Sequence, residues 1–244
     1  MKKLIVANLK MHGTKFEIEE LINQYNQIKT SHAQVVLCLP YPYLYLFKSN
    51  NISLGAQDVS NKEVGAFTGQ VSAEMLADFK VDYCLVGHAE RRKYNAENTM
   101  QCYEKILQLL KHNITPILCV GENAKQREEG LTLKTLKKQV SGALKRLSPE
   151  DIKKVVIAYE PIWAIKNIVK VNPEEINNIN IEILKIVAKL LKQPFQDLQI
   201  PIIYGGAVNQ ENANEILSKK FVGGLIAGRF CLTASKFIEM CNNI

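Results

Sequence analysis

A histidine and a glutamate, two residue types that move protons, each follow a short apolar run in this 244-residue sequence. His88 lies in Gly87-His88-Ala89-Glu90-Arg91-Arg92, after the run at residues 83–86. Glu160 lies in Tyr159-Glu160-Pro161-Ile162-Trp163-Ala164-Ile165, after the run at residues 155–158. A carboxylate can take a proton from carbon while a neutral imidazole donates to a carbonyl oxygen. The two residues therefore indicate acid–base chemistry on a carbonyl compound.

Three further apolar runs end in residues that would assist such a reaction. Asn8 and Lys10 follow the first run, Tyr204-Gly205-Gly206-Ala207-Val208 lies at the seventh, and Ala227-Gly228-Arg229 follows the eighth. An ammonium group can stabilise an oxyanion, and backbone N–H groups in glycine-containing turns can hold a phosphate. The complete set predicts enolisation of a small phosphorylated carbonyl compound.

The elements that must position these residues alternate along the whole chain. Segments with helical periodicity separate eight short apolar runs, whose continuous hydrophobicity is typical of parallel strands buried on both faces. The expected strands are residues 4–7, 35–39, 52–56, 83–86, 116–120, 155–158, 200–203 and 221–226. The expected helices include residues 15–28, 98–111, 132–146, 173–192 and 211–218, the fourth of them beginning at the cap Asn172-Pro173.

The alternation predicts an α/β fold with one domain over residues 1–244, a closed (β/α)₈ barrel. The length also allows two small domains, but no linker-like stretch divides the chain. An open doubly wound sheet would normally carry a G-x-G-x-x-G turn after its first strand, whereas residues 8–13 read Asn-Leu-Lys-Met-His-Gly. Barrel active sites form at the carboxyl ends of the strands, where the residues above would meet.

Composition narrows the possible partners. Lys and Arg number 31 and Asp and Glu 24, giving a formal charge of +7, but the basic residues are dispersed and predict a solvated surface, with no nucleic-acid partner. No signal-like or membrane-length apolar stretch occurs, so we expect a cytoplasmic protein with no membrane partner.

The six cysteines form no C-x-x-C pair and predict buried thiols in a reducing compartment, with no metal site. They are Cys38, Cys84, Cys102, Cys119, Cys231 and Cys241.

Five segments, in order and over the whole chain, resemble the triosephosphate isomerase family. They are Asn8-Leu9-Lys10, Gly65-Ala66-Phe67-Thr68-Gly69, Gly87-His88-Ala89-Glu90-Arg91-Arg92, Ala158-Tyr159-Glu160-Pro161-Ile162-Trp163-Ala164 and Tyr204-Gly205-Gly206. The resemblance implies the (β/α)₈ TIM barrel. It also implies interconversion of dihydroxyacetone phosphate and D-glyceraldehyde 3-phosphate, a step of glycolysis and gluconeogenesis, without metal or organic cofactor.

The resemblance also implies residue roles. Glu160 would be the base and His88 the electrophile, assisted by Asn8, while Lys10 would neutralise charge and Glu90 would support Lys10 and His88. The substrate and its phosphate would contact Lys10, Asn8, Gly205, Gly206, Ala207, Ala227, Gly228 and Lys166. Thr68 would lie at the tip of a loop that enters a partner subunit of a homodimer; a plain surface hairpin is the alternative.

Several positions depart from the family pattern, chiefly around the phosphate. Lys166-Asn167-Ile168 stands where family members usually carry glycines in a lid, Ala207 replaces a serine, and Ala227 a glycine. Arg229 and Phe230 replace small residues, and Arg229 either binds phosphate or points to solvent. Other departures are Leu9, His12, Gln70 and Ala89.

These departures leave three hypotheses open. The first is a triosephosphate isomerase, and the second is a related isomerase of another phosphorylated sugar, such as a four-carbon one. The third is a barrel with weakened or lost activity that is kept as a binding protein.

Each residue also has a structural alternative: His88 as a core histidine, Glu160 as a capping or paired carboxylate, and Lys10 as a surface lysine. We expect Arg92 to make a structural ion pair and Trp163 to anchor the loop after the sixth strand.

Overall fold

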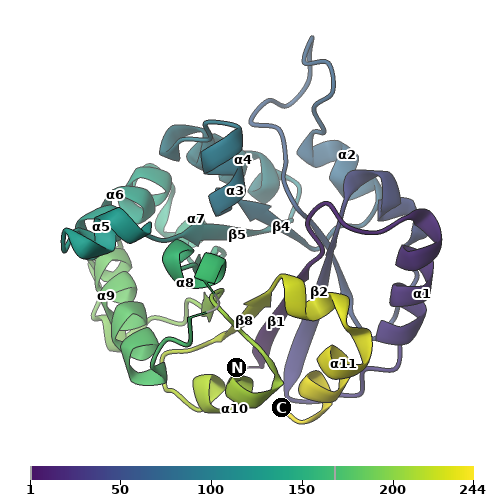
Figure 1. Cartoon of the computed structure of the whole chain (residues 1–244). Helices are drawn as coiled ribbons and strands as arrows, with labels where there is room; N and C mark the ends of the chain where they lie inside the picture. Colours follow the sequence, from purple (N-terminus) through teal and green to yellow (C-terminus); the bar gives the residue numbers. More distant parts are fainter. Residues whose placement is uncertain (1, 168) are drawn as a thin grey trace.

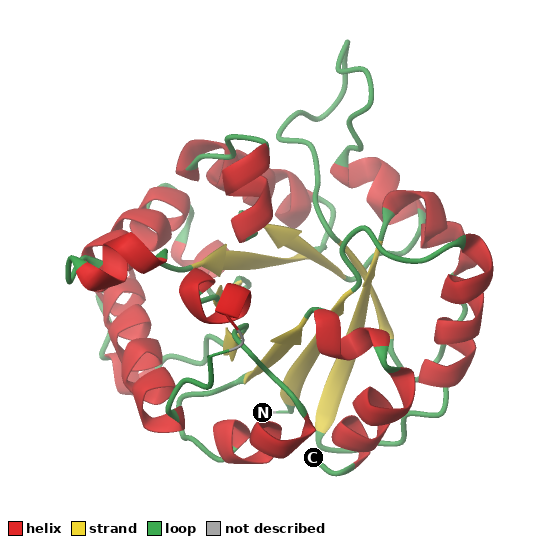
Figure 2. Ribbon diagram, viewed as in Figure 1, coloured by secondary structure: helices red, strands yellow, loops and turns green. Residues whose placement is uncertain are grey.

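The strands form one closed barrel in a computed structural model that describes residues 2–167 and 169–244. All neighbours are parallel, in the order β1 to β8, and β8 closes the barrel on β1 with Ala227 opposite Ala7. Figure 2 shows the strands at the centre of the molecule, inside the helices. The strands are β1 (Lys3–Asn8), β2 (Ala33–Leu39), β3 (Ser53–Ala56), β4 (Tyr83–Val86), β5 (Thr115–Val120), β6 (Val156–Tyr159), β7 (Ile202–Tyr204) and β8 (Gly224–Ala227). The predicted single-domain (β/α)₈ barrel is confirmed.

Helices surround the barrel as an outer ring (Figure 1). They are α1 (Lys15–Tyr25), α2 (Ala73–Asp78), α3 (Ala89–Tyr94), α4 (Thr99–Lys111), α5 (Ala124–Glu128), α6 (Thr132–Leu144), α7 (Pro149–Ile152), α8 (Ile162–Asn167), α9 (Pro173–Leu191), α10 (Gln210–Leu217) and α11 (Ala234–Asn242). Three 3₁₀ turns complete the chain: η1 (Tyr41–Leu46), η2 (Phe195–Asp197) and η3 (Arg229–Leu232). Local caps start most helices; the Asn172 side chain, for example, accepts the Glu174 N–H at the start of α9.

Both faces of the sheet are buried, which explains the continuous apolar runs. Alternate strand residues such as Leu4 and Val6 belong to a small cluster with Leu85 and Ile117, which fills the barrel interior. Their neighbours, such as Ile5, pack outward in a larger cluster that includes the helix residues. No described helix is long and apolar enough to cross a membrane.

Several element ends differ from expectation by one to three residues. Tyr159 and Tyr204, expected just after their strands, are the last residues of β6 and β7, with ring centroids 6.3 Å apart. The ladder continues through them because their buried rings pack against each other. The first helix ends at Tyr25 and not at residue 28.

All six cysteines are free and buried. Burial raises the pKa of every one of these thiols, to about 12 for Cys102, Cys231 and Cys241. A thiol with a raised pKa stays protonated at neutral pH and packs as a small apolar group.

One loop leaves the compact body. Between β3 and α2 the chain rises well above the ring of helices before it returns (Figure 1). Val64 and Phe67 in this loop expose 84% and 40% of their surface. Apolar side chains on a projecting loop are unusual for a surface that faces only water.

Candidate active site

A cavity of about 930 Å³ opens at the carboxyl ends of the strands. The residues that line it come from several of the turns after strands, as expected for a barrel. They include Asn8, Lys10, His12, His88, Glu90, Glu160, Ile165, Lys170, Gly205, Gly206, Ala207, Gly228, Arg229 and Lys236. Most of the predicted site residues therefore share one cavity.

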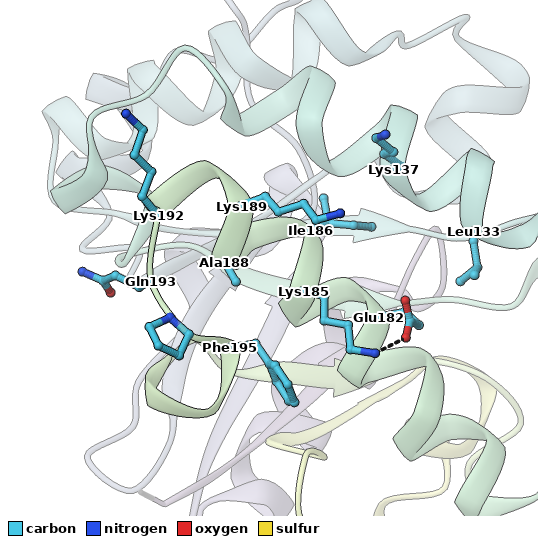
Figure 3. Close-up of a pocket in the computed structure, with 11 residues that line it drawn as sticks. Leu133, Lys137, Glu182, Lys185, Ile186, Ala188, Lys189, Lys192, Gln193 and Phe195 are labelled. Atoms are coloured by element: carbon cyan, nitrogen blue, oxygen red, sulfur yellow. Dashed lines mark hydrogen bonds and ion pairs between the residues drawn. The ribbon is translucent and has the colours of Figure 1, made fainter.

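A second hollow, of about 530 Å³, lies on the flank of the barrel between α6 and α9 (Figure 3). Its lining combines apolar residues with the lysines Lys137, Lys185, Lys189 and Lys192. Its one carboxylate, Glu182, pairs with Lys185 at 2.7 Å. This hollow contains no histidine, so the acid–base pair distinguishes the first cavity from it.

His88 and Glu160 face each other in the first cavity. Nε2 of His88 lies 3.5 Å from Oε1 of Glu160, and the two residues expose only 6% and 3% of their surface. His88 is the N-cap of α3, and its Nδ1 accepts the Glu90 N–H at 3.3 Å. A neutral ring whose Nδ1 accepts must carry its proton on Nε2, directed at the cavity.

Two glycines make room for Glu160. A β-carbon on Gly121 would lie 1.8 Å from the Glu160 carbonyl oxygen, and one on Gly205 would lie 2.8 Å from Glu160 Cγ. The Glu160 N–H donates to the Val120 carbonyl at 2.8 Å, which fixes the backbone. Oε2 of Glu160 is buried and has no hydrogen-bond partner among the described residues. This carboxylate oxygen is therefore not committed to a hydrogen bond within the described part of the protein.

Lys10 adopts a left-handed backbone conformation, with φ of 52°. Such a conformation costs a non-glycine residue about 1–3 kcal/mol and needs support. Its N–H donates to Asn8 Oδ1 at 3.0 Å, and Gln57 Nε2 donates to its carbonyl at 2.9 Å. These bonds fix the turn that carries the Lys10 ammonium group into the cavity.

The Lys10 ammonium group pairs with Glu90, the two atoms lying 2.7 Å apart. Burial acts to raise the pKa of Glu90, but the hydrogen bond and charge of Lys10 outweigh it, so this pKa lies below its ordinary value. Glu90 Oε2 also lies 3.6 Å from His88 Nδ1. Glu90 therefore stands between the lysine and the histidine, as a charged carboxylate at neutral pH.

The turn after β7 presents free donors to the cavity. The Gly205 N–H donates to Tyr159, and Asn212 Nδ2 donates to the Ala207 carbonyl at 2.8 Å, so both ends of the turn are held. Within the described residues, no acceptor takes the N–H of Gly206 or Ala207. Two unpaired N–H groups on a fixed turn can bind an anion.

Three predicted residues are not placed in the cavity lining. Ala227 is buried in the core, and only its neighbours Ile226 and Gly228 reach the cavity. The side chain of Lys166 lies outside the described part of the chain, as do those of Asn167 and Ile168. Thr68 belongs to the projecting loop, away from this chain's own cavity lining.

Arg92 and Trp163 both hold structure around the site. Arg92 donates to the Gly87 carbonyl at 2.7 Å and to the Cys119 carbonyl at 3.1 Å, so the expected ion pair is wrong: its partners are backbone carbonyls. The guanidinium group can approach these carbonyls because Gly87 has no side chain; a β-carbon there would lie 2.5 Å from Arg92 Nη2. Trp163 donates to the fully buried Glu122 at 2.9 Å, and this bond ties the start of α8 to the turn after β5.

The sequence analysis missed two contributors. Gln57, which supports Lys10, directly follows β3, so the strand-end rule could have identified it. Lys236 lies in α11, beyond the η3 turn, and no strand-end signal marks it. In the described residues, no group of three or more His, Cys, Asp or Glu side chains is placed to hold a metal ion.

Comparison with known proteins agrees with this geometry. A model of the triosephosphate isomerase family matches residues 3–244. The chain is 38% identical to a triosephosphate isomerase of Thermoanaerobacter sp. (strain X514), over 99% of both chains. It is also 38% identical to one of Ralstonia nicotianae, over 98% of this chain and 97% of the relative, and 36% identical to one of Clostridium perfringens, over 98% of both. The chain belongs to the triosephosphate isomerase family.

Proposed function

We propose that this chain interconverts dihydroxyacetone phosphate and D-glyceraldehyde 3-phosphate. The observation that carries the proposal is the buried pair His88 Nε2 and Glu160 Oε1, 3.5 Å apart in a cavity that also contains an ammonium group and free backbone donors. The six buried free thiols support a reducing location, the cytoplasm, where the reaction would serve glycolysis and gluconeogenesis.

The residues divide the reaction between them. Glu160 takes a proton from the carbon next to the carbonyl, and His88 donates from Nε2 to the carbonyl oxygen, giving an enediol intermediate. Glu160 then returns the proton to the neighbouring carbon, while His88 Nε2 takes a proton back from the other enediol hydroxyl, so the two residues end as they began and no atom is gained or lost. Lys10 stabilises the negative charge that develops on oxygen, with the Asn8 side chain in the same cavity.

The phosphate would lie at the turns after β7 and β8. Gly206 and Ala207 line the cavity and their N–H groups have no acceptor among the described residues, and Gly228 brings the chain close to Lys10. A β-carbon at Gly228 would lie 3.8 Å from Lys10 Nζ, so the ammonium group and the Gly228 turn can contact the same anion.

An isomerase assay tests the proposal. We expect turnover of D-glyceraldehyde 3-phosphate in a coupled assay, and a fall in kcat of about 10²–10⁴-fold in Glu160→Gln, which removes the base but keeps its shape. Glu160→Asp, which withdraws the carboxylate by about 1 Å, should cost about 10²-fold. Glu150→Gln, an exposed change in α7, is the matched control and should retain full activity.

Absence of turnover would contradict the proposed isomerase activity. A wild-type protein that is folded but shows no turnover at millimolar substrate would direct the assay to four-carbon sugar phosphates. Failure there too would favour a barrel kept as a binding protein.

We also infer a homodimer. The projecting loop around Thr68 exposes Val64 and Phe67, and Met11, next to the Lys10 turn, is 95% exposed. Burying these side chains against a second copy would remove apolar surface from water. In that arrangement Thr68 of one copy would lie near the cavity of the other.

A further inference from the structure

The cavity continues outward beyond the groups that the proposed reaction uses. Asn8, His88 and Glu160 are buried at its floor, while Gly206 and Gly228 are half-buried. The outermost lining residues include Arg229 and Lys236, both exposed. The volume of about 930 Å³ therefore has a floor for the reacting carbons, a middle for one phosphate, and a positively charged mouth.

The two cations at the mouth differ from the others in the cavity. Lys10 is paired with Glu90 at 2.7 Å, and Lys170 with Glu211 at 3.3 Å. Among the described residues, neither Arg229 nor Lys236 makes an ion pair. Their charges are thus available to an anion that enters the cavity.

The backbone that carries these two cations is held in place. In η3 the Cys231 N–H and thiol both donate to the Gly228 carbonyl, at 3.0 and 2.8 Å, and the Tyr25 hydroxyl donates to the Cys231 carbonyl at 2.6 Å. Phe230 packs edge-on against Phe237 of α11, with ring centroids 6.2 Å apart. A turn held by these contacts therefore carries Arg229 directly after Gly228, and Arg229 is the more exposed of these two lining residues.

We propose that Arg229 and Lys236 form a second anion subsite, so that the cavity binds a diphosphate group with its inner phosphate at the glycine turns and its outer phosphate at these two cations. The inner position is the one assigned under the proposed function, on which this inference rests. A single triose phosphate leaves the outer subsite empty, so a diphosphate would act as a competing ligand and inhibitor.

The diphosphate could be inorganic pyrophosphate or the end of a nucleoside diphosphate. The recognising chemistry is the same, since in both ligands the outer of two adjacent phosphates meets the two cations beyond the glycine turns. Exposed ion pairs contribute a few-fold each to binding, so the two cations together should contribute about tenfold.

Titration calorimetry at fixed ionic strength, without divalent cations, tests the subsite directly. We expect wild-type protein to bind pyrophosphate at least tenfold more tightly than inorganic phosphate, and the double variant Arg229→Ala/Lys236→Ala to lose most of this ratio. The matched control is Lys137→Ala/Lys189→Ala in the flank hollow of Figure 3, which removes the same charge and should keep the ratio within about twofold.

Other outcomes decide against the subsite. If the Arg229/Lys236 variant weakens phosphate and pyrophosphate equally, the two cations serve the single phosphate position and the proposal is overturned. An unchanged ratio overturns it as well.

Adenosine diphosphate as a third ligand identifies the source: a gain like that of pyrophosphate supports a nucleotide, and no gain supports the inorganic ion. Because calorimetry needs no turnover, failure of the isomerase assay and failure of the subsite remain separate results.

Discussion

Ala207 lies in the cavity wall between Gly206 and the helix α10, whose N-cap is Asn209. Its N–H is a free donor, but its side chain offers none, whereas the family pattern places a serine hydroxyl here. Loss of one neutral donor typically weakens binding by about 0.5–1.5 kcal/mol. Under the proposed function, phosphate binding would therefore depend more on backbone N–H groups and Lys10 than the family pattern implies.

Restoring the hydroxyl should strengthen substrate binding. For Ala207→Ser we expect KM for D-glyceraldehyde 3-phosphate to fall by about 2- to 10-fold with little change in kcat, because the added bond goes to the non-reacting phosphate. Steady-state kinetics on both proteins measure this. An unchanged KM would mean that a hydroxyl at 207 does not reach the phosphate.

At the scale of elements, Glu97 connects β4, α3 and α4. Its carboxylate accepts the Gly87 N–H at 2.8 Å, just before His88, and pairs with Lys105 at 2.6 Å and Arg91 at 3.3 Å. Burial acts to raise the pKa of Glu97, but Lys105, Gly87 and Arg91 together hold it below its ordinary value of 4.5. Asp58, on the same lysine, has a pKa raised by burial.

The lowered pKa of Glu97 gives a pH prediction. Because the folded state holds the proton less tightly than the unfolded state, the stabilisation is complete above pH 4.5 and is lost as pH falls through the lower folded pKa. We expect Glu97→Gln to be less stable at pH 7 by about 1–3 kcal/mol, and to lose less stability than the wild type between pH 5 and about 3. Urea unfolding across this range measures both. Asp58, whose pKa is raised, acts in the opposite sense but is present in both the wild type and Glu97→Gln. If the stability of both proteins falls in parallel as the pH is lowered, Glu97 is not the group whose protonation is linked to unfolding.

The sequence predicts elements best where burial is two-sided. The eight apolar runs locate all the strands, since both faces of the barrel are covered, and the longest helix, α9, begins at its expected cap. Short helices such as α5 and α8 were not predicted, because five or six residues carry less than two turns of periodicity. His88 and Glu160 were located by the strand-end rule, whereas Lys236 reaches the cavity through tertiary packing of η3 and α11.

At the scale of the whole molecule, the projecting loop and the Lys10 turn expose apolar side chains that the barrel itself does not need. The barrel closes without them, and Met11, Val64 and Phe67 do not belong to its hydrophobic core. The exposed side chains are better explained by a second copy than by the isolated chain.

Sedimentation velocity tests the dimer. We expect wild-type protein to sediment at twice the 27.5 kDa of one chain, and Phe67→Asp, which introduces a charge on the loop, to dissociate and lose activity. Phe79→Asp, which changes another exposed phenylalanine outside the loop, is the control and should remain dimeric. A wild-type monomer with full activity would contradict the inferred assembly.

The burial of all six thiols has a consequence for how the molecule can be followed over time. An alkylating reagent reacts only with the thiolate, so the protonated, buried thiols of the folded chain do not react with it. Cys38 and Cys119 lie inside the barrel, whereas Cys102 and Cys241 are buried residues of the helices α4 and α11. The labelling rate at each cysteine would therefore report how often its own region opens, and the six cysteines together would report local unfolding across the barrel.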